Sequence, residues 1–175
     1  MNNPVLLNNL KTLFNPHTVA VIGASENPDK LGFHVMKSLT LGRFKGKIVP
    51  VNPGAQSVMN LPAFPSLEDF PGKIDLAIVV LPAKLVPGIF QGCSRKGVKG
   101  IVLISAGFKE IEDSQGALLQ KTLADLANQA GIPVIGPNTF GMVNLHMDLN
   151  ASFTPEFSWL PRGGIALVSQ SGGIS

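Results

Sequence analysis

The sequence predicts an α/β fold built on a doubly wound, mainly parallel sheet. Short apolar runs rich in β-branched residues alternate along the chain with segments whose apolar residues recur at helical spacing. Such alternation is typical of strand–helix–strand units with right-handed crossovers. Of the 175 residues, 45% are hydrophobic and only 14% are charged, which favours a sheet covered on both faces. We therefore expect a Rossmann-like arrangement with helices on both faces of the sheet.

The expected elements follow in chain order. Strands are expected at 18–23, 47–53, 75–81, 100–104, 133–135 and 164–168, and helices at 4–14, 31–41, 84–96 and 114–130. Residues 54–65 are expected to be a loop, 66–69 a single helical turn, and 145–163, which show no clear period, a linker or an ordered loop. Pro50 should lie near the end of its strand. Pro87 should lie in the first turn of its helix, where a missing N–H is tolerated.

The pattern divides the chain into one domain and the beginning of another. We expect a Rossmann-like domain at residues 1–150, a linker at 151–163 and the truncated start of a second domain at 164–175. An apolar strand and a glycine-rich turn are present at 164–173, but the helix that should follow them is missing. Because a lone strand and turn cannot bury an apolar face, this segment is expected to belong to a longer protein.

A phosphate site is predicted where the first strand ends. Gly23, Ala24 and Ser25 follow the strand directly, and a polar loop ending in Lys30 leads to the helix that contains Gly32. A glycine turn lets backbone N–H groups approach an anion, and a helix N-terminus adds partial positive charge. Ser25 can donate to a phosphate oxygen, and Lys30 can neutralise phosphate charge.

The other strand ends supply the remaining candidate binding residues. In a doubly wound sheet the ligand lies beyond the carboxyl ends of the strands. The residues found there are Asn52, Pro53, Pro82, Ser105, Ala106, Gly107, Asn138 and Thr139. They are small or carry hydroxyl or amide groups, and none forms a carboxylate–histidine pair. The pattern therefore indicates a binding site, and no catalytic residue or metal ligand is assigned.

Composition argues against several classes of partner. The basic residues are scattered, and with no tyrosine and one tryptophan the chain lacks the basic stripe with interleaved aromatics typical of nucleic-acid binding. No apolar run reaches the roughly 18 residues of a membrane span, and no signal peptide is recognisable. Cys93 is the only cysteine, which excludes an internal disulfide and is compatible with the reducing cytoplasm. We expect a cytoplasmic protein that binds neither nucleic acid nor membranes.

Five motifs occur in order at the ends of successive expected strands. They are Val19-Ala20-Val21-Ile22-Gly23-Ala24-Ser25 with Gly32, Val51-Asn52-Pro53, Ser105-Ala106-Gly107-Phe108-Lys109-Glu110, Gly136-Pro137-Asn138 with Gly141, and Ser169-Gln170-Ser171-Gly172-Gly173. In this order they resemble the N-terminal CoA-binding domain of the nucleoside-diphosphate-forming acyl-CoA synthetases. This family includes the ADP-forming acetate–CoA ligases and is related to the succinyl-CoA synthetase α subunit. The resemblance covers nearly the whole chain.

The resemblance implies coenzyme A or acyl-CoA as the ligand of residues 1–150. It places Asn52 and Pro53 near adenine and ribose, and Ser105, Ala106, Gly107 and Asn138 along the pantetheine arm. Thr139 departs from the family, in which many members carry a small residue or cysteine there. A phosphate-carrying histidine would lie in downstream ligase domains of the same or a partner chain, the first of them succinyl-CoA-synthetase-like, so this chain alone should be inactive.

Two alternatives remain open at this point. The same domain opens bacterial protein lysine acetyltransferases of the fused type, where it would be a regulatory CoA-binding domain. An NAD-binding Rossmann module is the other alternative. Its fingerprint needs Gly-x-Gly-x-x-Gly and an acidic residue at the end of the second strand. This chain has Gly23-Ala24-Ser25 and Asn52 at those places.

Overall fold

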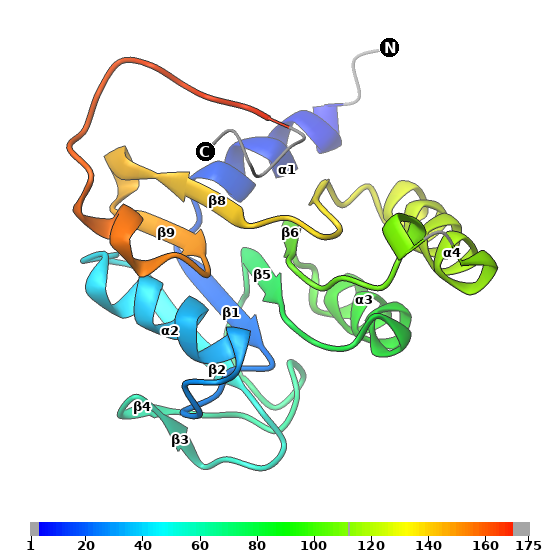
Figure 1. The fold of residues 1–175 in the computed structure, drawn as a ribbon, viewed down its shortest axis with the longest axis horizontal. Helices are drawn as coiled ribbons and strands as arrows, with labels where there is room; N and C mark the ends of the chain where they lie inside the picture. Colours follow the sequence, from blue (N-terminus) through cyan, green and yellow to red (C-terminus); the bar gives the residue numbers. More distant parts are fainter. Residues whose placement is uncertain (1–3, 112, 170–175) are drawn as a thin grey trace.

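The centre of the computed structural model, which describes residues 4–111 and 113–169, is a five-stranded parallel sheet (Figure 1). Its strands are β1 (Thr18–Ile22), β2 (Lys47–Val51), β5 (Leu76–Val79), β6 (Gly100–Leu103) and β7 (Val134–Ile135). They are ordered β2-β1-β5-β6-β7, and each neighbouring pair is parallel. The chain winds outward from β1 to β2 and then, from β5 on, in the opposite direction. The doubly wound fold predicted from the sequence is confirmed, and its topological switch point lies between β1 and β5.

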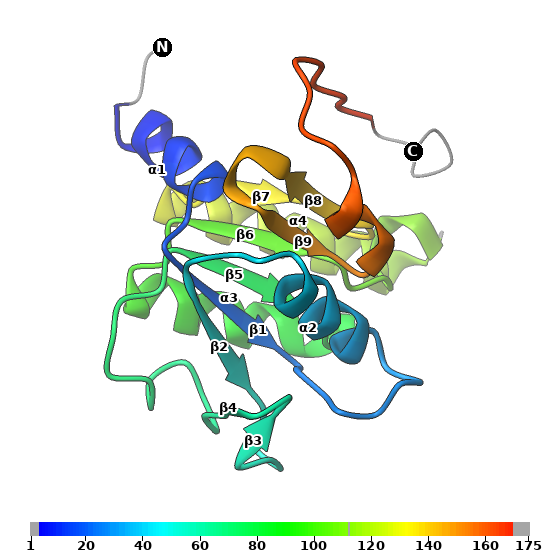
Figure 2. The same cartoon turned by 90° about the vertical axis from the view of Figure 1, so that its left-hand side faces the viewer.

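Helices cover both faces of this sheet, as Figure 2 shows. They are α1 (Pro4–Phe14), α2 (Leu31–Leu41), α3 (Val86–Lys96) and α4 (Ser114–Ala130). Alternate residues of each strand point to opposite faces. In β1, Val19 and Val21 pack with residues of α1 and α2, whereas Ala20 and Ile22 pack with residues of α3 and α4. A near-continuous apolar strand is therefore buried on both sides.

Helix ends are set by residues that the sequence already marks. Pro87 lies in the first turn of α3, as expected. Gly97 and Gly131 end α3 and α4 in the left-handed conformation, with φ of 71° and 62°. Asp113 caps α4 by accepting a hydrogen bond from the Gln115 N–H. These caps fix where each helix leaves the sheet.

The segment after β2 differs from the expected loop and helical turn. Residues 54–65 contain a small hairpin of β3 (Ser57–Val58) and β4 (Leu61–Pro62). Met59 and Asn60 form its two-residue turn with φ of 50° and 63°, which is the geometry that matches strand twist. At 66–69 the chain makes a turn that does not continue into a helix, and the Asp69 carboxylate accepts hydrogen bonds from both the N–H and the Oγ of Ser66, as at a helix N-terminus.

A second hairpin extends into the segment 145–163, which the sequence predicts to be a linker or an ordered loop. Strands β8 (Gly141–Asn144) and β9 (Leu149–Ser152) pair antiparallel across the short helix η3 (Leu145–Met147), and η4 (Pro155–Trp159) follows. Met142, Leu149 and Ala151 join the core on the α2 face. Residue 150 therefore lies inside a buried strand, although the proposed division between 1–150 and 151–163 stays a prediction.

Buried polar residues explain why the hydrophobic pattern of the sequence does not predict this hairpin. Asn150 and Ser152 are buried but hydrogen-bonded to each other, with the Ser152 Oγ donating to the Asn150 Oδ1 over 2.6 Å. The Asn150 Nδ2 also donates to the Thr154 carbonyl and to the Ser158 Oγ. A strand whose buried residues are amides and hydroxyls does not show an apolar alternation.

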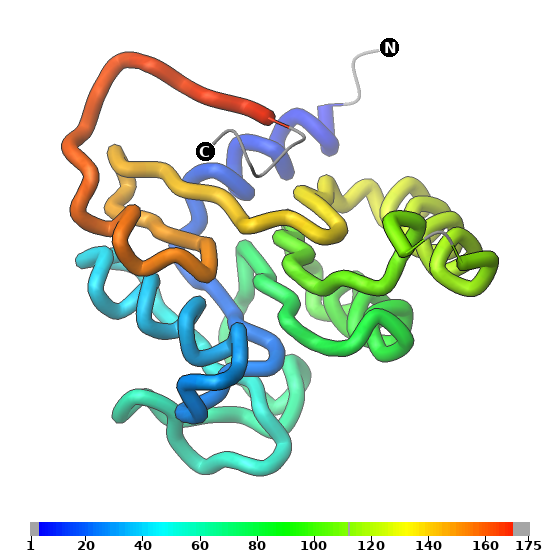
Figure 3. The backbone as a smooth tube through the Cα atoms, in the orientation of Figure 1, coloured from blue at the N-terminus to red at the C-terminus, as the bar shows by residue number. Residues whose placement is uncertain are grey.

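The strand expected at 164–168 is not present. Residues 164–169 belong to no strand, and Ile165 and Val168 are each 97% exposed. A strand needs a neighbouring strand for its backbone hydrogen bonds, and this segment leaves η4 without one within the described residues (Figure 3). Residues 170–173 of the motif 169–173, and the second half of the predicted start of a second domain at 164–175, lie outside the described residues.

None of the helices within residues 4–111 and 113–169 has the length and apolar character needed to cross a bilayer.

Leu149→Ala tests whether the β8–β9 hairpin is integral to the domain. Leu149 is 1% exposed, so its truncation should lower the free energy of unfolding by roughly 2 to 5 kcal/mol. Leu160→Ala is the matched control, because Leu160 is 51% exposed and should cost well under about 1 kcal/mol. Denaturant unfolding followed by circular dichroism measures both. Equal effects of the two substitutions would show that the hairpin is not part of the cooperative core.

Candidate ligand-binding site

The turn between β1 and α2 is built on two glycines in direct contact. Gly23 has φ of +95°, and a Cβ there would lie 2.9 Å from the Val80 carbonyl oxygen. A Cβ on Gly32 would lie 1.9 Å from the Gly23 carbonyl oxygen. The first turn of α2 therefore rests on the backbone at the carboxyl end of β1, which only glycine permits.

The N-terminus of α2 has no side-chain cap. Lys30 stands at the N-cap position in an extended conformation and makes no capping hydrogen bond. Its side chain is exposed, so its positive charge adds to that of the helix N-terminus. This end of the sheet is consequently suited to a negatively charged group.

The loop before α2 is held by its own side chains. The Ser25 Oγ accepts a hydrogen bond from the Asn27 N–H at 3.1 Å, and the Asn27 Oδ1 accepts one from the Asp29 N–H at 2.9 Å. Ser25 is 9% exposed, and Ala24 is buried. A hydroxyl that accepts one bond still carries a proton to donate.

Asn52 ties the end of β2 to the β1–α2 turn. Its Nδ2 donates to the Ala24 carbonyl at 2.7 Å, and its Oδ1 accepts from the Gly54 N–H at 2.8 Å. Both ends of the amide are engaged within the chain, while the neighbouring Pro53 is exposed. Asn52 therefore sets the shape of this corner of the site.

Ser105 links the ends of β5, β6 and β7 by hydrogen bonds in the same way. Its Oγ accepts a hydrogen bond from the Leu81 N–H at 3.1 Å, and its carbonyl accepts one from the Asn138 N–H at 3.0 Å. Pro82 and Asn138 are exposed beside it, and the Thr139 Oγ1 accepts from the Gly141 N–H at 3.3 Å. One buried serine thus joins three strand ends.

The turn after β6 is closed by a carboxylate. The Gly107 N–H donates to the Glu110 Oε1 at 2.6 Å, and the Phe108 N–H donates to both Glu110 oxygens at 3.1 Å. Desolvation raises the pKa of Glu110, but these backbone hydrogen bonds outweigh it and hold that pKa below its ordinary value. Ala106 remains exposed next to the turn.

All the residues predicted from the sequence lie at the carboxyl edge of the sheet, in the turns after β1, β2, β5, β6 and β7 or at the start of α2. The structure adds two exposed cations at this edge, Lys84 in η1 (Ala83–Leu85) and Lys109 in η2 (Lys109–Ile111). It also adds Glu110. The sequence signal for all three is a charged residue within a few positions of a strand end.

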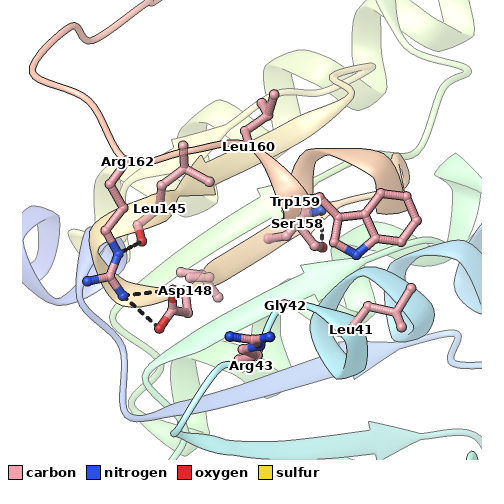
Figure 4. Close-up of a pocket in the computed structure, with 11 residues that line it drawn as sticks. Leu41, Gly42, Arg43, Leu145, Asp148, Ser158, Trp159, Leu160 and Arg162 are labelled. Carbon is pink, nitrogen blue, oxygen red and sulfur yellow. Dashed lines mark hydrogen bonds and ion pairs between the residues drawn. The ribbon is translucent and has the colours of Figure 1, made fainter.

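A hollow lies at the end of α2 opposite the Gly23 turn (Figure 4). It has a volume of about 390 Å³ and is lined by Arg43, Asp148, Trp159 and Arg162 among others. The Arg162 guanidinium donates to both Asp148 oxygens at 2.9 Å, and this hydrogen bonding lowers the pKa of Asp148. The hollow is separate from the strand ends. Elsewhere in the described residues, no group of histidine, cysteine, aspartate and glutamate is arranged to hold a metal ion.

A parallel sheet with a switch point, and an uncapped helix N-terminus resting on a glycine turn, are typical of doubly wound proteins that bind nucleotides. Comparison with known families agrees and is more specific. Residues 17–144 match the family described as CoA binding domain. The chain belongs to this CoA-binding domain family.

Acid–CoA ligases are among the relatives of this chain. The chain is 42% identical over 165 residues to an acetate–CoA ligase (ADP-forming) II subunit alpha of Pyrococcus furiosus, covering 94% of this chain and 35% of that protein. It is 40% identical over 163 residues to an acetate–CoA ligase (ADP-forming) II of Archaeoglobus fulgidus, covering 93% of this chain and 24% of that protein.

A solved structure gives the same relation. The dinucleotide-forming acetyl-coenzyme A synthetase 1 of Ca. Korarchaeum cryptofilum, in complex with phosphate and ADP, superposes with a TM-score of 0.88 at 39% identity. The match covers 95% of this chain and 35% of that one. The chain therefore spans about a quarter to a third of the length of these relatives.

Gly32→Ala tests the contact between α2 and the Gly23 turn. Because the new methyl group would overlap the Gly23 carbonyl oxygen, we expect the free energy of unfolding to fall by roughly 1 to 3 kcal/mol. Gly88→Ala in α3 is the matched control, since nothing lies within 4 Å of its added Cβ. That substitution should be neutral or stabilising by up to about 1 kcal/mol. Thermal unfolding compares the two, and a neutral Gly32→Ala would mean that the helix does not press on the turn.

The capped turn after β6 should make stability depend on pH. Since the pKa of Glu110 is lower in the folded than in the unfolded chain, its contribution is present above about pH 4.3, the ordinary value, and is lost as the pH falls through the folded-state pKa. Denaturant midpoints measured from about pH 6 to about pH 3 should therefore fall more steeply in the wild type than in Glu110→Gln. Parallel curves would contradict the assignment.

Proposed function

We propose that this chain binds coenzyme A along the carboxyl edge of its sheet, as the CoA-binding part of an ADP-forming acyl-CoA synthetase. One observation carries the proposal: an uncapped helix N-terminus with Lys30 beside it rests on the Gly23 turn. Membership of the CoA-binding domain family and likeness to acetate–CoA ligases along 93–94% of the chain support it.

The phosphates of CoA would bind at the β1–α2 turn. Backbone N–H groups at the start of α2 face a phosphate there, and Lys30 neutralises part of its charge. The Ser25 hydroxyl accepts from Asn27 and keeps its own proton free to donate to a phosphate oxygen. Gly23 and Gly32 act by allowing the close backbone approach, and Ala24 by remaining small.

The rest of the ligand would follow the strand ends. Adenine and ribose would lie near Asn52 and Pro53, where no carboxylate is present to hold the ribose hydroxyls of NAD. The pantetheine arm would pass Pro82 and the small residues Ser105, Ala106 and Gly107 toward Asn138 and Thr139. The engaged side chains of Asn52 and Ser105 would act by fixing backbone shape rather than by reaching the ligand.

Catalysis would depend on parts of the ligase outside this chain. The relatives are about three to four times longer, and one of them is named as a subunit alpha. We propose that the remaining ligase domains, in the same or a partner chain, supply the phosphate-carrying histidine and the acyl site. A cytoplasmic location is part of the same proposal.

Calorimetric titration with CoA and with NAD tests the ligand class. We expect CoA to bind at least about tenfold more tightly than NAD. CoA carries three phosphates that can bind near the positively charged turn, and the end of β2 has no acidic residue to bind the ribose hydroxyls of NAD. Lys30→Ala should weaken CoA binding at low salt and matter less as salt rises. Lys37→Ala, an exposed lysine farther along α2, is the charge-matched control and should leave affinity unchanged. NAD binding as tight as CoA binding would overturn the proposal.

A further inference from the structure

The turn after β6 presents three successive backbone N–H groups. Those of Gly107 and Phe108 donate to the Glu110 carboxylate, and that of Lys109 donates to the Gln120 Oε1 at 3.2 Å. Gly107 has φ of +104°, so the chain curls around its own amides. Successive N–H groups in such a curl form a concave anion-binding site. In this protein the anion in that site is a side chain of the protein itself.

The Glu110 carboxylate and the turn that it caps are held firmly in place. The side chain of Phe108 is 0% exposed, which anchors the turn to the core. A Cβ on Gly116 would lie 2.2 Å from the Phe108 carbonyl oxygen, so α4 begins directly against the turn. Glu110 is tethered two to three residues from the amides that it caps, and a short tether gives a high effective concentration. An external anion must displace it to reach those amides.

The β1–α2 turn and the β6 turn both present backbone N–H groups at this edge of the sheet, but they differ in whether a side chain occupies those groups. At the β1–α2 turn no side chain caps the helix, and Lys30 stands at its N-cap position. At the β6 turn a carboxylate fills the site. Exclusion of a phosphate there comes from occupancy of the Gly107 and Phe108 N–H groups by Glu110.

We propose that Glu110 is a specificity-determining residue that fills the anion site of the β6 turn and so restricts phosphate to the β1–α2 turn. An uncharged arm of a ligand can pass over the filled turn, whereas a phosphate cannot bind in it. The inference rests on the proposed function, which it deepens by giving the edge one phosphate end and one neutral end. Glu110 does this without touching the reacting atoms.

Inorganic phosphate, followed by the amide resonances of the chain, tests the proposal. In the wild type, phosphate should leave the Gly107 and Phe108 amides unmoved. In Glu110→Ala the resonances of these two amides should shift with phosphate concentration until they saturate. The apparent dissociation constant for phosphate should be at least about tenfold below any wild-type value. Glu110→Gln keeps an acceptor but loses the charge, and should give an intermediate response if the alanine variant is poorly folded. Glu156→Gln removes the same charge from an exposed position in η4 and should behave as the wild type.

Two results would overturn the inference. One is a phosphate response of the Gly107 and Phe108 amides in the wild type equal to that in Glu110→Ala; the other is no response in any folded Glu110 variant. A parallel titration of the wild type with CoA, read at the amides of Gly23 and Ser25, tests the proposed function separately. If those amides are silent, the CoA site is wrong while the phosphate experiment still decides the role of Glu110.

Discussion

The site depends on the contact between the backbone of Gly32 and the carbonyl of Gly23. It brings the first turn of α2 onto the end of β1, where no side chain would fit. The order of the sheet then matters, because β1 lies between β2 and β5, where the winding direction changes. A helix N-terminus pressed onto the strand at the switch point forms the end of the domain at which we propose that an anion binds. The other strand-end turns are arranged around that point.

Two polar side chains make the edge a single structure. Asn52 joins the ends of β1 and β2, and Ser105 joins those of β5, β6 and β7. Each uses hydrogen bonds that a loop residue would otherwise give to water or to a ligand. The cost is that these residues cannot also serve as the main ligand donors. The gain is an edge whose backbone shape is fixed before anything binds, which lowers the ordering cost of association.

Much of this was predictable from the sequence, for definite physical reasons. Strands buried on both faces, such as β1, are unbroken apolar runs, and helices such as α4 carry their apolar residues at helical spacing between a capping Asp113 and Gly131. Glycine turns after strands predict the location of the candidate site, and the structure brings these turns to one edge of the sheet. The two hairpins were not predicted from the sequence. The strands β3 and β4 have only two residues and so show no period, and β9 buries the polar residues Asn150 and Ser152.

The side-chain pairings within the site were also beyond the sequence. That Asn52 and Ser105 turn inward, and that Glu110 folds back onto Gly107, depends on distances that no local pattern contains. The strand expected at 164–168 shows a different limit. An apolar run states a preference for burial, but a strand forms only where a neighbouring strand accepts its hydrogen bonds.

The segment after β9 is connected through α2 to the β1–α2 turn, where we propose that phosphate binds. The Ser158 Oγ donates to the Ser38 carbonyl, and Asn150 in turn holds Ser158, so η4 is fastened to the last turns of α2. The other end of the same helix is seated on Gly23. Eleven helical residues make a rod of roughly 16 Å clamped at both ends. One short helix therefore links the segment that contains η4 directly to the turn at which we propose that phosphate binds.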